Sequence, residues 1–191
     1  MIPRWPASRS CTARENRSSA SFFTSSNHEP FEFPGGKIAL HDANKQSVNS
    51  AVKYADYALG KFIRAAKEQA YWKDTVFLIV ADHDNRVDGH TLVPIKQFHI
   101  PALILGADIA PRRIKTIASQ IDLGSTLLSL IGVSSEHPMI GRDLARESDG
   151  PGRALIQFNQ DFTWLEGRNA TILRPGKAPL LYREQRYRLP K

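Results

Sequence analysis

The sequence has little cysteine and no long hydrophobic run. Cys11 is the single cysteine among 191 residues, so the chain cannot form an intramolecular disulfide or a zinc site made of cysteines. The longest apolar runs, residues 76–81 and 100–105, fall far short of the roughly 18 to 20 residues that a membrane-spanning helix needs. We therefore expect neither a disulfide framework nor a membrane-spanning helix in these residues.

Several familiar catalytic and binding motifs are also absent. The sequence contains no Gly-x-Ser-x-Gly, no His-Glu-x-x-His and no dinucleotide-binding glycine pattern. Gly35-Gly36-Lys37 lacks the spaced glycine and the Ser or Thr of a phosphate-binding loop. The acidic stretch at 82–89 is no calcium loop, because Arg86 and Ile95 stand where oxygen ligands are required.

The net charge of +7 is concentrated at the two ends of the chain. Residues 1–20 carry +3, residues 151–191 carry +5, and the stretch between them carries −1. A nucleic-acid-binding module usually gathers its basic residues on one face of the folded domain. We therefore expect no nucleic-acid partner. Residues 1–20 have no hydrophobic period and are predicted to be a disordered or artefactual leader.

Hydrophobic periodicity predicts an alternating α/β arrangement in the middle of the chain. Apolar residues at steps of three and four predict an amphipathic helix over 46–72. The continuous apolar runs at 75–80 and 100–105 predict buried strands of a mostly parallel central sheet. Residues 112–131 are predicted to be helical, with a break near 122–124 that Asp122 caps and with Gly132 as the C-terminal cap.

The last forty residues predict a different architecture. Short strand candidates at 154–158, 170–173 and 180–182 are separated by glycine and proline, which is typical of an antiparallel meander. We therefore divide the chain into a leader (1–20), an α/β portion (21–150) and an antiparallel subdomain with a basic tail (151–191).

Asp82 and His83 follow directly after the most apolar predicted strand. In open α/β sheets, ligands bind at the carboxyl ends of strands. Carboxylate oxygen and imidazole nitrogen together suit Mn²⁺ or Zn²⁺ and, less strictly, Mg²⁺. A solvated acidic loop without a metal is the alternative that residue types alone leave open.

Five segments, in order along the chain, resemble the sulfatase-type enzymes of the alkaline phosphatase superfamily. Two of them, TSSNHEPF at 24–31 and ADHDNRVDG at 81–89, are similar to the lipoteichoic acid synthase and phosphoglycerol transferase branch. The others are FHIPALI at 98–104, SQIDL with TLLSL and a glycine over 119–132, and IGRDL at 140–144. The resemblance implies an alkaline-phosphatase-like partial sandwich, with a mostly parallel central sheet flanked by helices.

The resemblance also implies roles for individual residues. Asp82 and His83 correspond to metal ligands, with Mn²⁺ favoured and Mg²⁺, Ca²⁺ or Zn²⁺ as alternatives. His28 corresponds to a residue that contacts the substrate phosphate or the leaving oxygen. Arg86 is a candidate phosphate ligand, because a guanidinium binds such oxygens in a bidentate manner. The implied substrate is a phosphate or sulfate ester, such as that of a glycerophospholipid. The implied location of the parent is the bacterial inner membrane, with the domain facing the periplasm or the exterior.

The chain departs from this family in one major respect. The family nucleophile, a Thr, Ser or modified Cys, comes from a half of the domain that precedes all five segments, and we expect that half to be absent here. Cys11 lacks the proline of the Cys-x-Pro-x-Arg context, and neither Thr12 nor Thr24 follows a predicted strand as an activated nucleophile would. We therefore expect the isolated chain to be inactive.

Two alternatives remain open. The first is a non-catalytic module that binds anionic lipid or polymer through Arg183, Arg186, Arg188 and Lys191. The second is an interrupted reading frame that yields no stable protein.

Overall fold

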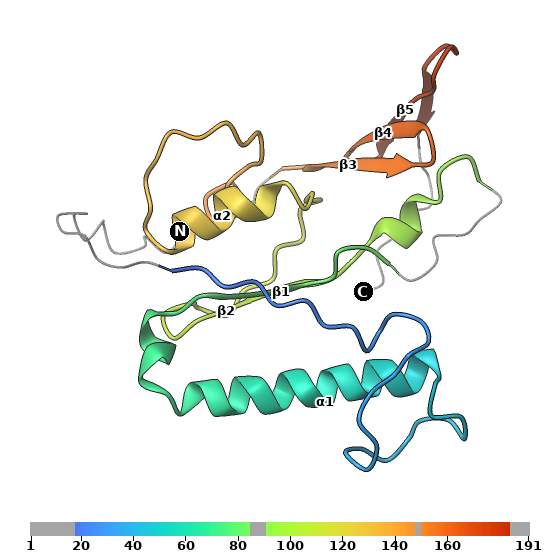
Figure 1. The fold of residues 1–191 in the computed structure, drawn as a ribbon. Helices are drawn as coiled ribbons and strands as arrows, with labels where there is room; N and C mark the ends of the chain where they lie inside the picture. The colour runs from blue at the N-terminus through green and yellow to red at the C-terminus, as the bar shows by residue number, and fades with distance from the viewer. Residues whose placement is uncertain (1–17, 85–90, 148–149, 184–191) are drawn as a thin grey trace. The chain divides into compact units, whose positions relative to one another are not determined.

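The fold is described from a computed structural model covering residues 18–84, 91–147 and 150–183. The chain divides into two units, residues 1–75 and residues 76–191. Figure 1 shows the elements of both units in chain order. Each unit is described below by itself.

The first unit is built around one long helix, α1 (Val48–Lys67). The structure confirms the helix predicted from the apolar period, although α1 ends before a separate 3₁₀ turn, η1 (Ala70–Asp74). Ser47 caps the amino end, since its hydroxyl accepts a hydrogen bond from the Ser50 amide at 3.1 Å. Within the described ranges, no helix is long and apolar enough to cross a membrane.

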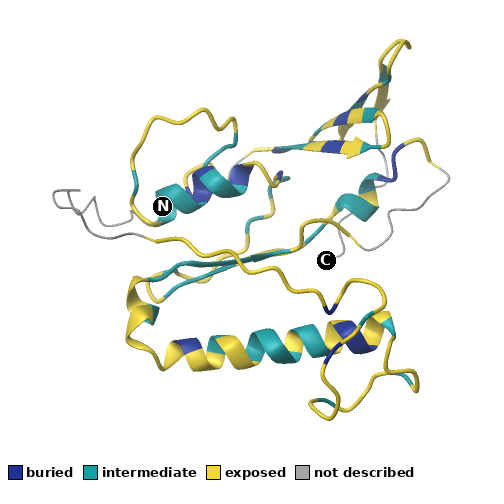
Figure 2. Cartoon of the chain, viewed as in Figure 1, coloured by how far each residue is buried: buried dark blue, intermediate teal, exposed yellow. Residues whose placement is uncertain are grey.

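An aromatic contact fastens the segment before α1 onto the helix. The ring of Phe33 stacks on that of Tyr54 with centroids 4.9 Å apart, and Phe33 is almost fully buried. Ala51 and Ala66 are the buried apolar residues of α1 itself, near its two ends (Figure 2).

The second unit begins with a two-stranded sheet of β1 (Phe77–Val80) and β2 (Ala102–Leu105). Both strands were predicted, but the mostly parallel sheet is not observed, because β1 and β2 pair antiparallel with Phe77 opposite Leu105. Continuous apolar runs report burial and not strand direction. The described part of the connection contains only a 3₁₀ turn, η2 (Ile95–Phe98), rather than the crossover helix typical of parallel neighbours.

The helix α2 (Asp122–Leu130) is shorter than predicted. Residues 112–120 are not helical, and Arg112 and Ile117 among them make tertiary contacts in the positions they take instead. The Arg112 guanidinium donates to the carbonyls of Leu144 and Ala145, each at 3.2 Å, and the Ile117 carbonyl accepts from the Arg153 amide at 3.1 Å.

The carboxyl end of α2 agrees with the sequence prediction. Gly132 adopts a positive φ of 70° and its amide donates to the Ser129 carbonyl at 3.1 Å, while the Val133 amide donates to Leu128 at 2.9 Å. This pair of bonds is the Schellman arrangement that glycine favours.

The second unit ends in a four-stranded antiparallel sheet. Its strands are β3 (Arg153–Phe158), β4 (Asp161–Glu166), β5 (Asn169–Leu173) and β6 (Leu180–Arg183), paired in chain order. The predicted meander is therefore confirmed, with β4 as an additional strand that the prediction omitted.

The inner face of this sheet carries the apolar core of the second unit. Ile156 and Ile172 are buried together with Val93, which lies just before η2. The ring of Phe98 packs edge to face on that of Phe158 with centroids 6.1 Å apart. Residues 93–98 thus cover one face of the sheet, since alternate side chains of its strands point toward them.

Candidate functional site

Asp82 and His83 lie immediately after β1, as predicted, and both side chains are largely exposed. The Asp82 side chain is 69% exposed and the His83 side chain is 75% exposed. Asp82 Oδ2 and His83 Nε2 lie 3.5 Å apart. The chain therefore turns as it leaves the strand, so that two adjacent residues direct polar atoms toward one point.

The hydrogen bonds around His83 define which of its nitrogens is available. Nδ1 lies 2.9 Å from the Asp84 carbonyl, which can only accept, so in the neutral imidazole Nδ1 carries the proton and Nε2 presents a lone pair. The second Asp82 oxygen, Oδ1, accepts from the His83 amide at 2.9 Å. Two lone-pair atoms, Asp82 Oδ2 and His83 Nε2, are thus left facing each other.

This geometry fits two donors to one divalent cation. Two ligands about 2.1 Å from a tetrahedral ion lie about 3.4 Å apart, close to the observed 3.5 Å. A ligating histidine commonly donates its other N–H to a carbonyl, as His83 does to Asp84. In the described part of the chain, no group of three or more His, Cys, Asp or Glu residues converges on one point. Metal binding by Asp82 and His83 remains a prediction, which their geometry fits.

The sequence analysis missed the role of Gln120, although it quoted this residue within a motif. Gln120 Nε2 donates to the Ala81 carbonyl at 3.0 Å and to the Asp82 carbonyl at 2.8 Å. The second carbonyl belongs to the peptide bond that joins Asp82 to His83. One amide group therefore holds the backbone on which both candidate ligands stand.

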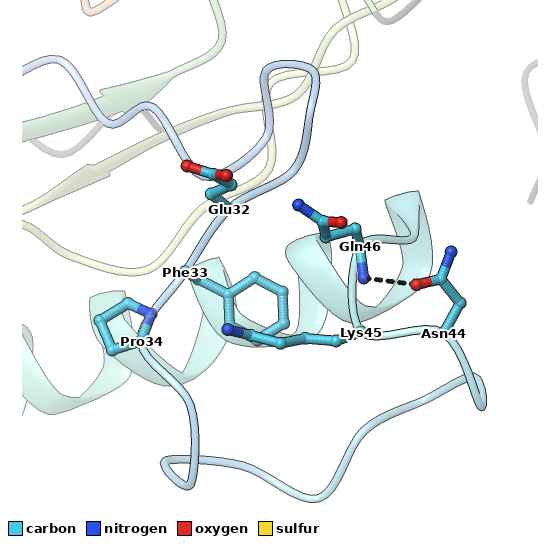
Figure 3. Close-up of a pocket in the computed structure, with 6 residues that line it drawn as sticks. All are labelled: Glu32, Phe33, Pro34, Asn44, Lys45 and Gln46. Carbon is cyan, nitrogen blue, oxygen red and sulfur yellow. Dashed lines mark hydrogen bonds between the residues drawn. The ribbon is translucent and has the colours of Figure 1, made fainter.

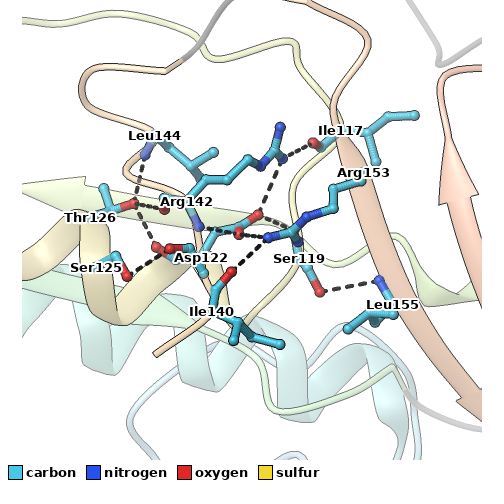
Figure 4. A network of polar contacts seen from close by, with 11 residues as sticks. Ile117, Ser119, Asp122, Ser125, Thr126, Ile140, Arg142, Leu144, Arg153 and Leu155 are labelled. Carbon is cyan, nitrogen blue, oxygen red and sulfur yellow. Dashed lines mark hydrogen bonds and ion pairs between the residues drawn. The ribbon is translucent and has the colours of Figure 1, made fainter. Parts of the chain in front are cut away.

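Asp122 was predicted to cap α2, and this prediction is wrong. Its carboxylate is fully buried and accepts from the amides of Ser119 at 2.9 Å and Arg142 at 2.8 Å rather than from an amide of α2. The guanidinium groups of Arg142 and Arg153 each lie 3.3 Å from one of its oxygens (Figure 4). Asp122 is therefore a structural anion that joins distant parts of the second unit.

The IGRDL segment docks on α2 through the hydroxyls of that helix. Thr126 Oγ1 accepts from the Leu144 amide at 3.0 Å, and Ser125 Oγ donates to the Gly141 carbonyl at 2.9 Å (Figure 4). A Cβ at Gly141 would overlap the carbonyl of Ile121, so the two segments approach each other as closely as glycine allows. These two family-like motifs therefore form one structural joint.

His28, the predicted substrate contact, lies in the first unit within a tight turn. Its amide donates to the Ser25 carbonyl at 3.0 Å and its carbonyl accepts from Phe31 at 2.7 Å. Nδ1 lies 2.7 Å from the Glu29 carbonyl, which leaves Nε2 for another partner. The turn thus presents one defined nitrogen of an exposed imidazole.

Other predicted features fall outside the described residues. These are Arg86, Cys11 and most of the predicted leader, and the basic residues Arg186, Arg188 and Lys191. Arg86 therefore stays a prediction. His99, the residue that follows η2, is exposed.

A surface hollow in the first unit contains none of the predicted site residues. It has a volume of about 490 Å³ and is lined by Glu32, Phe33, Pro34, Asn44, Lys45 and Gln46. Figure 3 shows Lys45 beside the ring of Phe33, with its Nζ 5.3 Å from the ring centroid. The charged groups that line the hollow are one carboxylate and one ammonium, which together favour no particular ligand.

Ser47, Asp42 and His41 form a cluster that has the residue types of a hydrolytic triad but not its geometry. Ser47 Oγ donates directly to Asp42 Oδ2 at 2.5 Å, whereas a nucleophilic serine gives its proton to histidine. Hydrogen bonds from Ser47 and His41 lower the pKa of the Asp42 carboxyl. The cluster therefore serves the amino end of α1, where Ser47 is the cap.

Comparison with protein families and curated proteins gives a consistent assignment. The sulfatase profile matches residues 11–133. Phosphoglycerol transferase I of Xanthomonas euvesicatoria is 32% identical over 113 residues, which cover 58% of this chain and 16% of that protein. Lipoteichoic acid synthase of Staphylococcus saprophyticus is 24% identical over 174 residues, covering 76% of this chain and 26% of that protein. The chain thus spans well under half the length of these relatives.

Solved structures extend the comparison to the fold. A Vibrio parahaemolyticus protein in the alkaline phosphatase superfamily has a TM-score of 0.79 and 51% sequence identity, covering 83% of this chain and 39% of that one. Ps i-CgsB has a TM-score of 0.56 at 16% identity, which shows a similar fold alone. The sulfatase profile covers Asp82, His83 and Gln120 in one continuous match, and the chain belongs to the sulfatase family.

Proposed function

We propose that this chain contributes the Asp82–His83 metal ligands of a sulfatase-family catalytic domain that acts on phosphate or sulfate esters. The observation that carries the proposal is the pair of facing lone-pair atoms, Asp82 Oδ2 and His83 Nε2, 3.5 Å apart at the end of β1. Both side chains are exposed, so both atoms are accessible to a cation from solvent.

The proposed chemistry is ester cleavage or transfer at phosphorus or sulfur. A divalent cation, when bound, neutralises the non-bridging oxygens and lowers the pKa of a nucleophile. Asp82 and His83 hold it, with Mn²⁺ favoured on the mixed oxygen and nitrogen donor set. His28 presents Nε2 to the substrate phosphate or the leaving oxygen, since its Nδ1 is engaged with Glu29. Arg86 binds phosphate oxygens as a fork.

The relatives narrow the proposed substrate class. They are named as phosphoglycerol transferases and lipoteichoic acid synthases, so the favoured ester is a phosphoglycerol group, carried by a glycerophospholipid. Such a substrate places the parent protein at a bacterial membrane, with the domain on its outer or periplasmic side.

We also propose that the 191 residues alone have negligible turnover. The sequence offers no hydroxyl or thiol in a nucleophile context, and Thr24 lies outside every named helix and strand. We therefore expect this chain to bind the metal. The chemical step requires a nucleophile on another part of the parent.

Titration with Mn²⁺, followed by electron paramagnetic resonance, tests the metal site. Wild-type chain is expected to bind Mn²⁺ and to gain thermal stability in its presence, because a ligand that binds only the folded state stabilises it. Asp82→Ala and His83→Ala are each expected to lower the affinity at least tenfold. Asp108→Ala and His137→Ala remove an exposed residue of the same type elsewhere in the second unit and serve as matched controls. Equal Mn²⁺ binding by all five proteins would refute the site.

Turnover of nitrophenyl phosphate and bis-nitrophenyl phosphate tests the second half of the proposal. The isolated chain is expected to release no nitrophenol above background with Mn²⁺ present. Robust release that disappears in both Asp82→Ala and His83→Ala would overturn the proposed inactivity and leave the metal site intact.

The Asp82→Ala variant also distinguishes the proposed metal site from the alternative in which the chain binds an anionic surface. Arg183 at the end of β6 is exposed, as a lipid-binding residue must be. Salt-sensitive binding to vesicles containing anionic lipid, unchanged in Asp82→Ala, together with absent Mn²⁺ binding, would favour the non-catalytic alternative.

A further inference from the structure

Resting on the proposed function, we propose that Gln120 is the positioning residue of the metal site. Its side-chain amide donates to two consecutive carbonyls, Ala81 at 3.0 Å and Asp82 at 2.8 Å. These carbonyls flank Asp82, and the second one lies on the peptide between the two candidate ligands. Fixing that peptide fixes the direction in which Asp82 and His83 leave the backbone.

The need for such a clamp follows from the geometry of a strand. Successive side chains of an extended strand point to opposite faces, so adjacent residues direct donors to one ion only where the backbone turns. The described sheet ends at Val80, and no ladder bond of β1 holds residues 81 and 82. Gln120 supplies two hydrogen bonds at the place where the sheet supplies none.

Gln120 is itself held in place by the buried network. The Ser119 amide donates to Asp122 Oδ2, and the Asp122 amide donates to the Ser119 carbonyl, both at 2.9 Å. Asp122 is fully buried and paired with Arg142 and Arg153. The turn that carries Gln120 is therefore closed by two hydrogen bonds between Ser119 and Asp122, which fix the backbone from which the Gln120 side chain leaves.

The clamp contributes to geometry rather than to overall stability. Gln120 is exposed, and water competes for exposed hydrogen bonds, so their net contribution to folding is small. Loss of an outer-shell partner typically lowers metal affinity by about 10- to 100-fold. A positioning role therefore predicts a large change in metal affinity with a small change in folding.

Gln120→Met is the test variant, because methionine has nearly the same length and no charge but lacks the N–H donors. Gln157→Met is the matched control, since Gln157 is an exposed glutamine on β3 of the same unit. With Mn²⁺ alone as the probe, the dissociation constant is expected to rise about 10- to 100-fold in Gln120→Met and to stay unchanged in Gln157→Met. The urea midpoint of the metal-free protein is expected to stay unchanged in both.

Carbon and nitrogen NMR of the metal-free protein gives a second readout, in which the carbonyl signals report the two hydrogen bonds and the His83 signals report the orientation of the candidate ligands. In Gln120→Met, the carbonyl ¹³C signals of Ala81 and Asp82 are expected to shift upfield. The imidazole ¹⁵N signals of His83 are expected to move toward a mixture of tautomers, because the bond from Nδ1 to Asp84 loosens.

The outcomes distinguish this inference from the proposed function. Wild-type and Gln120→Met chains that bind Mn²⁺ equally would overturn the positioning role and leave the metal site standing. A wild-type chain that binds no Mn²⁺ would refute the proposed function, and the NMR signals of Ala81, Asp82 and His83 would then decide whether Gln120 orients the pair. Unchanged signals would overturn the inference.

Discussion

Two acidic residues of the second unit have opposite surroundings. Asp122 is fully buried and receives two backbone amides and two guanidinium groups. Asp82 has a 69% exposed side chain and receives one amide, that of His83. The first carboxylate has its hydrogen-bonding capacity filled by the protein, whereas the second keeps one oxygen free for an external partner.

This difference separates a structural anion from a candidate ligand. Buried charges persist only when they are paired, because desolvation otherwise costs several kcal/mol. An exposed carboxylate beside a lone-pair nitrogen has no such requirement and gains from a cation. Both residues lie in family-like motifs, so a motif alone does not reveal which role its acid plays.

Removal of the buried carboxylate is expected to have the largest effect. Asp122→Ala leaves Arg142 and Arg153 without their anion and should lower the free energy of unfolding by about 3 to 5 kcal/mol, measured by urea denaturation followed by circular dichroism. A loss below about 1 kcal/mol would mean that the two arginines find other partners or solvent, and the contrast with Asp82 would fail.

The close approach at Gly141 should give a smaller effect. Gly141→Ala places a Cβ against the Ile121 carbonyl, and relief of that overlap forces IGRDL away from α2 at a cost of about 1 to 3 kcal/mol. Gly35→Ala is the matched control, since its Cβ would make only an ordinary contact 3.9 Å from Lys45 Nζ. Similar urea midpoints for both variants would contradict the proposed joint.

The exposed carboxylate should give the smallest effect on folding. Asp82→Ala is expected to change the free energy of unfolding of the metal-free chain by no more than about 0.5 kcal/mol, because one exposed hydrogen bond is lost. The same urea experiment checks this. A loss comparable to that of Asp122→Ala would assign Asp82 to the fold and remove the distinction between the two acids.

Several secondary-structure elements could be predicted from local sequence patterns alone. The period of apolar residues located α1, and glycine at position 132 located the end of α2, because both signals arise within a few residues of chain. The position of Asp82 and His83 after a strand also followed from the change from apolar to polar residues. Strand β4 buries Thr163 and exposes Phe162 and Trp164, which is the reverse of what apolar and polar alternation in its sequence predicts.

The remainder depends on contacts between distant residues. The direction of β2 relative to β1, the non-helical course of 112–120 and the role of Asp122 all follow from partners more than ten residues away. Apolar runs and cap residues are local signals and contain no information on those partners. Gln120 is the clearest example, since its carbonyl partners precede it by 39 and 38 residues.

The antiparallel pairing of Val80 with Ala102 closes the intervening chain into a loop whose two ends meet at one sheet edge. The entropy of closing a loop grows only with the logarithm of its length, and a doubling costs about 0.6 kcal/mol. A change in the number of residues between the two strands is therefore expected to cost little closure entropy, provided that residues 93–98 keep their packing on the four-stranded sheet. Asp82 and His83 lie at the base of this loop, where such changes leave the preceding strand in place.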